Sequence, residues 1–288
     1  LAIVLGMTFH SCLDLEPQDQ LGGENMWTSV NDYKQFANTF YSWTRDFSSV
    51  VYDGTHSDKR SDLITYQSYN EFSRGINSIP SSDANYTDNY KHIRRTNLLL
   101  QNAEAYAKPE DIKQYIGEAY FFRAYSYFDL LQLYGDVIIT KKPLDITDPE
   151  MKVKRNDRSE VVDLIIDDLN HAVENLPAFK ELTTEEEGRI SKEGAQAFLS
   201  RVALYEGTWQ KSRNGNQNTQ RSANLLDIAA KAARTVIDAK YGYTFRLFGT
   251  DSETKILGDS AQKYMFILEN EKSNPAGIKK SSNHEYIF

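Results

Sequence analysis

The spacing of apolar residues along the chain predicts a protein built mainly of helices. Apolar side chains recur every three or four positions over long stretches, which is the pattern of an amphipathic α-helix. One stretch begins at Thr87, and the others span residues 29–47, 117–134, 158–177, 191–209 and 222–242. We therefore expect a mainly α fold.

The first of these stretches carries a start signal as well as a periodic pattern. Ser29 and Asp32 stand three residues apart, as in the capping motif at the N-terminus of a helix. The aromatic residues that follow have helical spacing and are Tyr33, Phe36, Phe40, Trp43 and Phe47. These two signals predict a helix that begins after Ser29.

Residues 117–137 hold seven aromatic rings, which suit either a ligand platform or a protein core. At 100° per residue most of the rings fall in one broad arc, while Glu118, Ser126, Asp129 and Gln132 lie opposite. Phe122, Tyr125 and Leu133 interrupt this polar side. A helix that is apolar almost all round packs on more than one side, and Gly135 fits the position just past its end. The rings are therefore interpreted mostly as core.

The last three helical stretches alternate small and bulky side chains, as in Ala195, Phe198 and Ala203. This alternation suits close antiparallel packing of helix pairs, as in tetratricopeptide-type repeats, although no strict 34-residue period is present.

On the stretch that begins at Thr87, Asn97 falls on the apolar face, where we expect a buried, hydrogen-bonded amide rather than a ligand group. Residues 48–85 lack any sustained period, and ordered loops of such length are usually functional.

Composition narrows the classes of function. The 288 residues carry a net charge of −8 with a pI of about 5.3, which argues against a nucleic-acid partner. Tyrosine (18 residues) outnumbers phenylalanine (14 residues), which favours a binding protein. The sequence contains no phosphate-binding glycine loop, zinc motif or nucleophile elbow, so we expect neither an enzyme nor a cofactor. Asp53–Asp58, with His56, is interpreted as a solvated turn rather than a cation site.

The N-terminus suggests a membrane anchor. Leu1–Phe9 is apolar and uncharged, long enough for the core of a secretory signal and too short to span a bilayer. Cys12, the sole cysteine, follows this run directly and cannot form an internal disulfide. It is either an incidental thiol of a discarded signal or the lipid-modified first residue of a lipoprotein, and its position favours lipidation. Several acyl chains on one cysteine anchor a protein without spanning the membrane.

Several motifs resemble the SusD/RagB family of outer-membrane nutrient-binding lipoproteins. The segment "CLDLEPQDQ", which begins at Cys12, is similar to the start of the mature family members. The segment "YTDNYKHIRRTNLLLQNAE" resembles the family's tyrosine–isoleucine–asparagine helix. The most specific segment is "IGEAYFFRAYSYFDLLQLYGDV", and residues 158–177 and 188–205 follow in the family's order. The resemblance extends from Cys12 to about Phe248.

This resemblance implies tetratricopeptide-like helix pairs with long ligand-binding loops. It also implies a lipoprotein, anchored at the outer membrane and facing the cell surface, that binds oligosaccharides or polysaccharide. The implied partner is a SusC-like TonB-dependent transporter, to which the ligand is delivered without any reaction. A peptide-binding member of the family or a helical-repeat interaction scaffold is the alternative. Residues 1–11 are then a signal segment clipped at its start, residues 12–245 a helical-repeat domain, and residues 246–288 the start of a truncated C-terminal part.

The candidate ligand residues come from the long loop and the beginning of the helix after it. A sugar site needs aromatic faces for apolar ring surfaces and polar side chains for hydroxyl groups. Both kinds are present here, and we expect some of them to contact glycan: Asp58, Arg60, Asp62, Tyr66, Tyr69, Tyr86 and Asn89. The alternative is that these side chains cap loops or contact the partner transporter.

Overall fold

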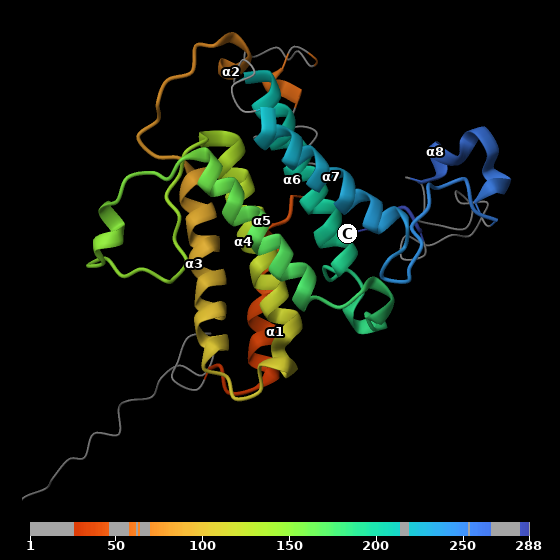
Figure 1. Cartoon of the computed structure of the whole chain (residues 1–288), viewed down its shortest axis with the longest axis horizontal. Helices are drawn as coiled ribbons and strands as arrows, with labels where there is room; N and C mark the ends of the chain where they lie inside the picture. Colours follow the sequence, from red (N-terminus) through yellow and green to blue (C-terminus); the bar gives the residue numbers. More distant parts are fainter. Residues whose placement is uncertain are drawn as a thin grey trace, which may run out of the picture.

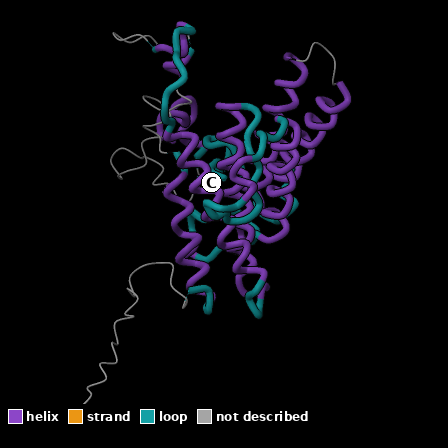
Figure 2. Tube along the Cα trace, turned by 90° about the vertical axis from the view of Figure 1, so that its left-hand side faces the viewer, coloured by secondary structure: helices purple, strands orange, loops and turns teal. Residues whose placement is uncertain are grey.

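The computed structural model of the chain describes residues 26–45, 58–61, 63, 70–213, 219–252, 254–265 and 283–287 (Figure 1). Within these ranges the regular structure is helical, apart from one isolated β-bridge between Val137 and Asn156. Figure 2 shows the long helices running side by side as a layered bundle. The predicted mainly α fold is confirmed.

The long helices match the stretches predicted from the sequence, and two very short ones accompany them. In the described ranges the α-helices are α1 Val30–Asn38, α2 Glu71–Arg74, α3 Ala84–Glu104, α4 Lys113–Tyr134, α5 Arg158–Asn175, α6 Lys192–Arg213, α7 Thr219–Ile237 and α8 Ala261–Met265. The 3-10 helices used below are η1 Thr39–Trp43 and η3 Asp58–Arg60.

The start of α1 is capped as predicted, but the α-helix is shorter than expected. The Ser29 Oγ accepts a hydrogen bond from the Asp32 amide at 3.3 Å, and the Asp32 carboxylate accepts one from the Ser29 amide at 2.8 Å. After Asn38 the chain tightens into η1, which ends at Trp43. Phe47 lies outside the described residues.

The predicted start of the third helix was wrong by three residues. We expected Thr87, whereas α3 begins at Ala84 because Asp83 caps it, accepting a hydrogen bond from the Asn85 amide at 2.9 Å. Within this helix Asn97 is buried, and its amide donates to the Thr140 carbonyl oxygen at 3.0 Å. The prediction of a buried and satisfied Asn97 is confirmed.

Consecutive helices pack antiparallel, as the alternation of small and bulky residues predicts. Leu176, just past the end of α5, lies against Gly117 near the start of α4; a Cβ at Gly117 would stand 2.9 Å from the Leu176 backbone nitrogen. Gly207, near the end of α6, faces Leu226 in the first half of α7 in the same way. Glycine at each crossing thus permits a close approach of two helices.

Helix α4 lies at the centre of the bundle, with α3 and α5 against it (Figure 1). Of the seven rings in residues 117–137, four belong to the core and are at most 5% exposed: Phe121, Phe122, Tyr127 and Phe128. The interpretation of most of these rings as core is confirmed. The other three, Tyr120, Tyr125 and Tyr134, are half-buried and reach the surface of the bundle.

None of the described helices combines the length and the apolar character needed to cross a bilayer. The predicted domain boundaries at residues 11 and 245 stay predictions. Beyond Gly242 the described residues form short elements, among them α8.

Candidate functional site

The residues predicted to bind ligand divide into two groups. Three of them, Asp62, Tyr66 and Tyr69, lie outside the described residues, as does Cys12, the predicted lipidation site. The other four lie on two elements: Asp58 and Arg60 in η3, and Tyr86 and Asn89 in the first turns of α3. Whether these residues contact a ligand stays a prediction.

Arg60 and Tyr86 converge on the place where α3 begins and α4 ends. Tyr134, the last residue of α4, donates a hydrogen bond from its hydroxyl to the Asp83 carboxylate at 2.6 Å. Its ring meets the edge of Tyr86 at a centroid distance of 5.3 Å. Burial lowers the pKa of Arg60, and the neighbouring charge of Asp83 acts in the opposite direction. Arg60 also lies over the ring of Phe72, 3.7 Å from its centroid.

Tyr86 lines a hollow of about 300 Å³ between α3 and the loop after α4, here called the Tyr86 hollow. The Tyr90 ring stands 4.8 Å from Tyr86, and its hydroxyl donates to the Ile138 carbonyl oxygen at 2.8 Å. On the opposite wall Lys142 pairs with Glu150 at 2.8 Å. The hollow therefore offers two tyrosine rings beside a polar rim.

The remaining two described candidates differ from Tyr86. Asn89 is 8% exposed, and its amide donates to the Asn85 carbonyl oxygen of its own helix at 2.8 Å. Asp58 is exposed on η3. Among the four described candidates, Tyr86 is thus the one that lines the Tyr86 hollow.

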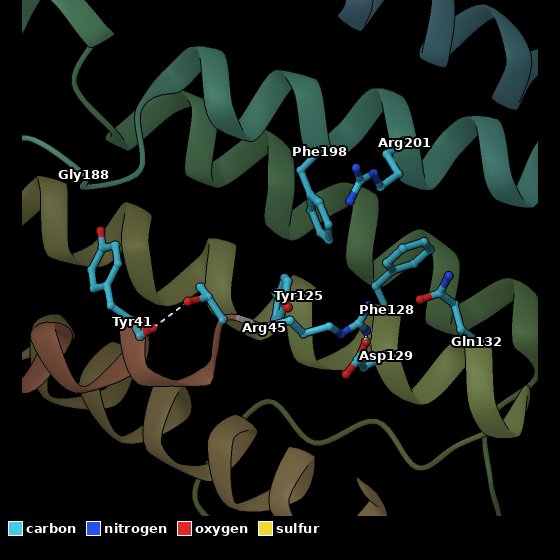
Figure 3. A pocket seen from close by; sticks show the side chains of 10 residues that line it. Tyr41, Arg45, Tyr125, Phe128, Asp129, Gln132, Gly188, Phe198 and Arg201 are labelled. Atoms are coloured by element: carbon cyan, nitrogen blue, oxygen red, sulfur yellow. Dashed lines mark hydrogen bonds and ion pairs between the residues drawn. The ribbon is translucent and has the colours of Figure 1, made fainter. Parts of the chain in front are cut away.

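A second cavity of about 580 Å³ lies between α4, α6 and the chain after η1, and sequence reasoning missed it. We call it the α4–α6 pocket. Figure 3 shows that Phe198 and Arg201 point down from α6 toward α4, while Arg45 reaches in along α4 toward Asp129. Its lining residues are Tyr41, Thr44, Arg45, Tyr125, Phe128, Asp129, Gln132, Gly188, Phe198 and Arg201.

The α4–α6 pocket combines aromatic faces with charged side chains. The Tyr125 and Phe198 rings stand 5.6 Å apart with 32° between their planes. Arg45 donates to the Asp129 carboxylate, so the acid of this pocket is neutralised. A glycosidase needs two carboxyl groups facing each other across a cleft. Of the described residues that line the pocket, Asp129 is the only carboxylate, and the described residues hold no cluster suited to a metal ion.

Aromatic faces next to hydrogen-bonding side chains are what a carbohydrate requires, because a sugar has apolar ring faces and a polar rim. Both cavities meet this requirement, the first with Tyr86 and Tyr90 and the second with Tyr125 and Phe198. One sign of the second cavity was present in the sequence, since Tyr125 interrupts the polar side of its helix.

The curated proteins to which the chain is similar are named SusD-like proteins. SusD-like protein P2 of Formosa agariphila is 26% identical over 99% of this chain and 57% of that protein. SusD-like protein P38 of the same organism is 27% identical over 68% of this chain and 39% of that protein. The chain therefore spans about half the length of the curated relatives it matches.

Fold and family comparisons agree with these relatives. A solved SusD-like protein of Bacteroides fragilis superposes with a TM-score of 0.66 at 23% identity, covering 95% of this chain and 46% of the other. The SusD-like_3 family model, described as starch-binding associating with outer membrane, matches residues 13–204. Because this match includes well over half of the 288 residues, the chain belongs to that SusD-like family.

Proposed function

We propose that the protein is a cell-surface lipoprotein that captures oligosaccharides and delivers them to a SusC-like TonB-dependent transporter of the outer membrane. The observation that carries this proposal is the family match over residues 13–204, in a family described as starch-binding. The two ring-lined cavities support it, because each can hold a sugar face against a tyrosine. On this proposal the protein binds and transfers, and catalyses no reaction.

We place the first glycan contacts at the Tyr86 hollow and the neighbouring part of the long loop. Tyr86 is half-buried and fixed on two sides by Tyr90 and Tyr134, so its ring is held in one orientation. A preoriented ring loses little conformational entropy on binding. Tyr66 and Tyr69 are proposed as further contacts, and Asp58, Arg60, Asp62 and Asn89 as polar ones.

Affinity electrophoresis of the protein in gels containing starch, laminarin or xyloglucan tests the proposal. We expect at least one polysaccharide to retard the protein, and Tyr86→Ala to weaken that retardation. Tyr264→Ala changes a half-buried tyrosine of α8, remote in the fold, and serves as the matched control. Unchanged glycan affinity in the combined Tyr66→Ala, Tyr69→Ala and Tyr86→Ala variant would remove this surface from the proposal.

Peptide binding within the same family is the second candidate function. Stacked helix pairs form extended surfaces that commonly bind peptides, which is the observation in its favour. A parallel screen against a peptide library separates the two functions. Retention of peptides, with no retardation by any polysaccharide, would replace the glycan by a peptide ligand.

The lipid anchor is tested at Cys12. Metabolic labelling with a radioactive fatty acid is expected to mark the wild-type protein, and Cys12→Ala is expected to abolish the label and release the protein from membranes. The single cysteine makes the assignment unambiguous. Co-purification with the SusC-like transporter from solubilised outer membranes tests the proposed partner.

A further inference from the structure

We propose that the α4–α6 pocket binds an acidic unit of the glycan, a sugar that carries a carboxylate or a sulfate, with Arg201 as the anion-binding group. The inference rests on the proposed function, because it assumes that the ligand is a carbohydrate. It assigns to this pocket a class of sugar that a neutral polysaccharide does not contain.

The charges that line the pocket do not cancel. Among the lining residues that the structure describes, the guanidinium groups of Arg45 and Arg201 face one carboxylate, Asp129. Arg45 forms the ion pair with Asp129, whereas Arg201 is exposed and has no carboxylate partner in the part of the chain that the structure describes. The pocket therefore has one positive charge in excess, although the chain as a whole has a net charge of −8.

The two guanidinium groups share one local environment. Burial lowers the pKa of Arg45, and the positive charge of Arg201 lowers it further. An anion placed between the two groups would remove this repulsion. A guanidinium has five donors in a planar fork that matches carboxylate or sulfate oxygens, and it accepts no hydrogen bond. A sugar hydroxyl offers only a neutral acceptor, so an acidic substituent gains more from Arg201.

An apolar wall stands next to this charge. Phe198 precedes Arg201 by three residues on α6, and residues at that spacing share one face of a helix. The half-buried Tyr125 ring lies 5.6 Å from Phe198 and completes the wall. A sugar can thus place its apolar face on the rings while its acidic group reaches Arg201.

Polar groups at the rim are free to bind hydroxyls. Within the described residues the Tyr125 hydroxyl and the Gln132 amide, both lining the pocket, form no hydrogen bond. Each of these two groups can both donate and accept a hydrogen bond. The volume of about 580 Å³ lies inside the usual range of small-ligand sites, roughly 300–1,000 Å³.

A third cavity shows by contrast why the charge matters. The groove of about 590 Å³ between α5 and α7 is lined by Asp163, Asp167 and Arg221, which gives it one negative charge in excess. Arg221 there is paired with Asp163 at 2.9 Å. Of these two grooves, the α4–α6 pocket is thus the one suited to an anion.

Calorimetric titration of the full-length protein tests the inference with three probes: an oligogalacturonate for the carboxylate, a sulfated carrageenan oligosaccharide for the sulfate, and a neutral xylo-oligosaccharide. We expect at least one acidic probe to bind and to lose affinity at high salt, because the contact is ionic. Arg201→Gln should weaken that binding about tenfold or more and flatten its salt dependence. Arg201→Lys keeps the positive charge and should retain part of the affinity that Arg201→Gln loses.

Two controls keep the result specific to the pocket. Arg213→Gln removes an exposed arginine from the C-terminal end of the same helix and should leave all three affinities unchanged. Tyr125→Leu removes the ring and its hydroxyl but keeps an apolar side chain, and should weaken binding of the same acidic probe without changing its salt dependence. Thermal unfolding of each variant verifies that the fold is retained.

The outcomes separate this inference from the proposed function. Equal affinity of wild type and Arg201→Gln for every acidic probe overturns the acidic site, and so does binding of neutral probes alone. In both cases the proposed glycan capture is retained. Binding of no carbohydrate at all overturns the proposed function itself.

Discussion

Arg123 of α4 and Asp168 of α5 form an ion pair with two hydrogen bonds inside the helical core. The Nε–Oδ2 distance is 2.8 Å and the Nη2–Oδ1 distance is 2.6 Å, and the Asp168 side chain is fully buried. The remaining terminal nitrogen of Arg123 donates to the Asn97 side chain of α3 at 2.8 Å. A single guanidinium group therefore connects three consecutive helices.

The first prediction concerns this pair. Asp168→Ala leaves a buried guanidinium without its counter-ion, and we expect the free energy of unfolding to fall by roughly 3–5 kcal/mol. The double variant Arg123→Met with Asp168→Leu removes both charges, and its free energy of unfolding should fall much less. Urea denaturation measures both values. A loss below about 1 kcal/mol for Asp168→Ala would contradict the assigned role.

The second prediction compares two glycines at helix crossings. A Cβ at Gly117 would stand 2.9 Å from a backbone nitrogen of Leu176, whereas a Cβ at Gly207 would meet only the Leu226 and Leu225 side chains, at 3.0 Å or more. We expect Gly117→Ala to cost about 1–3 kcal/mol, because backbone must shift. Gly207→Ala should cost less, since a leucine side chain can move and alanine favours the helix by about 1 kcal/mol. Equal melting temperatures for the two variants would argue against a tighter crossing at Gly117.

The helices could be predicted from the sequence because their periodic apolar faces depend on local spacing alone. The burial of polar residues could not be predicted from the sequence. Glu118 and Ser126 lie on the side of α4 opposite most of its rings, yet both are fully buried. Glu118 meets Arg189, which is 71 residues away along the chain. A helical projection contains no information about such a remote partner, so a polar position resembles a solvent-facing one.

The candidate site shows the same limit. The sequence pointed to the long loop and α3, and Tyr86 does line a hollow there. The α4–α6 pocket was missed because its charged residues, Arg45, Asp129 and Arg201, come from segments far apart in the chain. They meet only after α4 and α6 have packed side by side.

The third prediction concerns the start of α1. The Ser29 hydroxyl and the Asp32 carboxylate satisfy backbone amides that the helix itself leaves unpaired. Ser29→Ala should lower the free energy of unfolding by about 0.5–2 kcal/mol. Ser29→Asn should retain most of the stability of the wild type, because asparagine also caps helices well. Thermal unfolding measured by circular dichroism tests both variants, and equal stability of Ser29→Ala and wild type would show that the cap contributes nothing.

The last prediction concerns the pH dependence of stability. Glu118 is fully buried, and burial raises its pKa from the usual 4.5 to about 7, outweighing the attraction of Arg189 at 3.4 Å. The Tyr41 hydroxyl and the Gln114 amide also face it, and both lower the pKa.

Because its pKa is higher in the folded state, Glu118 keeps a proton between pH 4.5 and about 7 that the unfolded chain has lost. Stability contributed by this group therefore falls as the pH rises through that window. Glu118→Gln cannot ionise, so its stability relative to wild type should increase between pH 4.5 and 7, at about 1.4 kcal/mol per pKa unit. Denaturant unfolding at a series of pH values measures this difference, with the exposed Glu104→Gln as control. A stability difference that stays constant across the window would show that Glu118 is ionised throughout, with Arg189 as a full counter-ion.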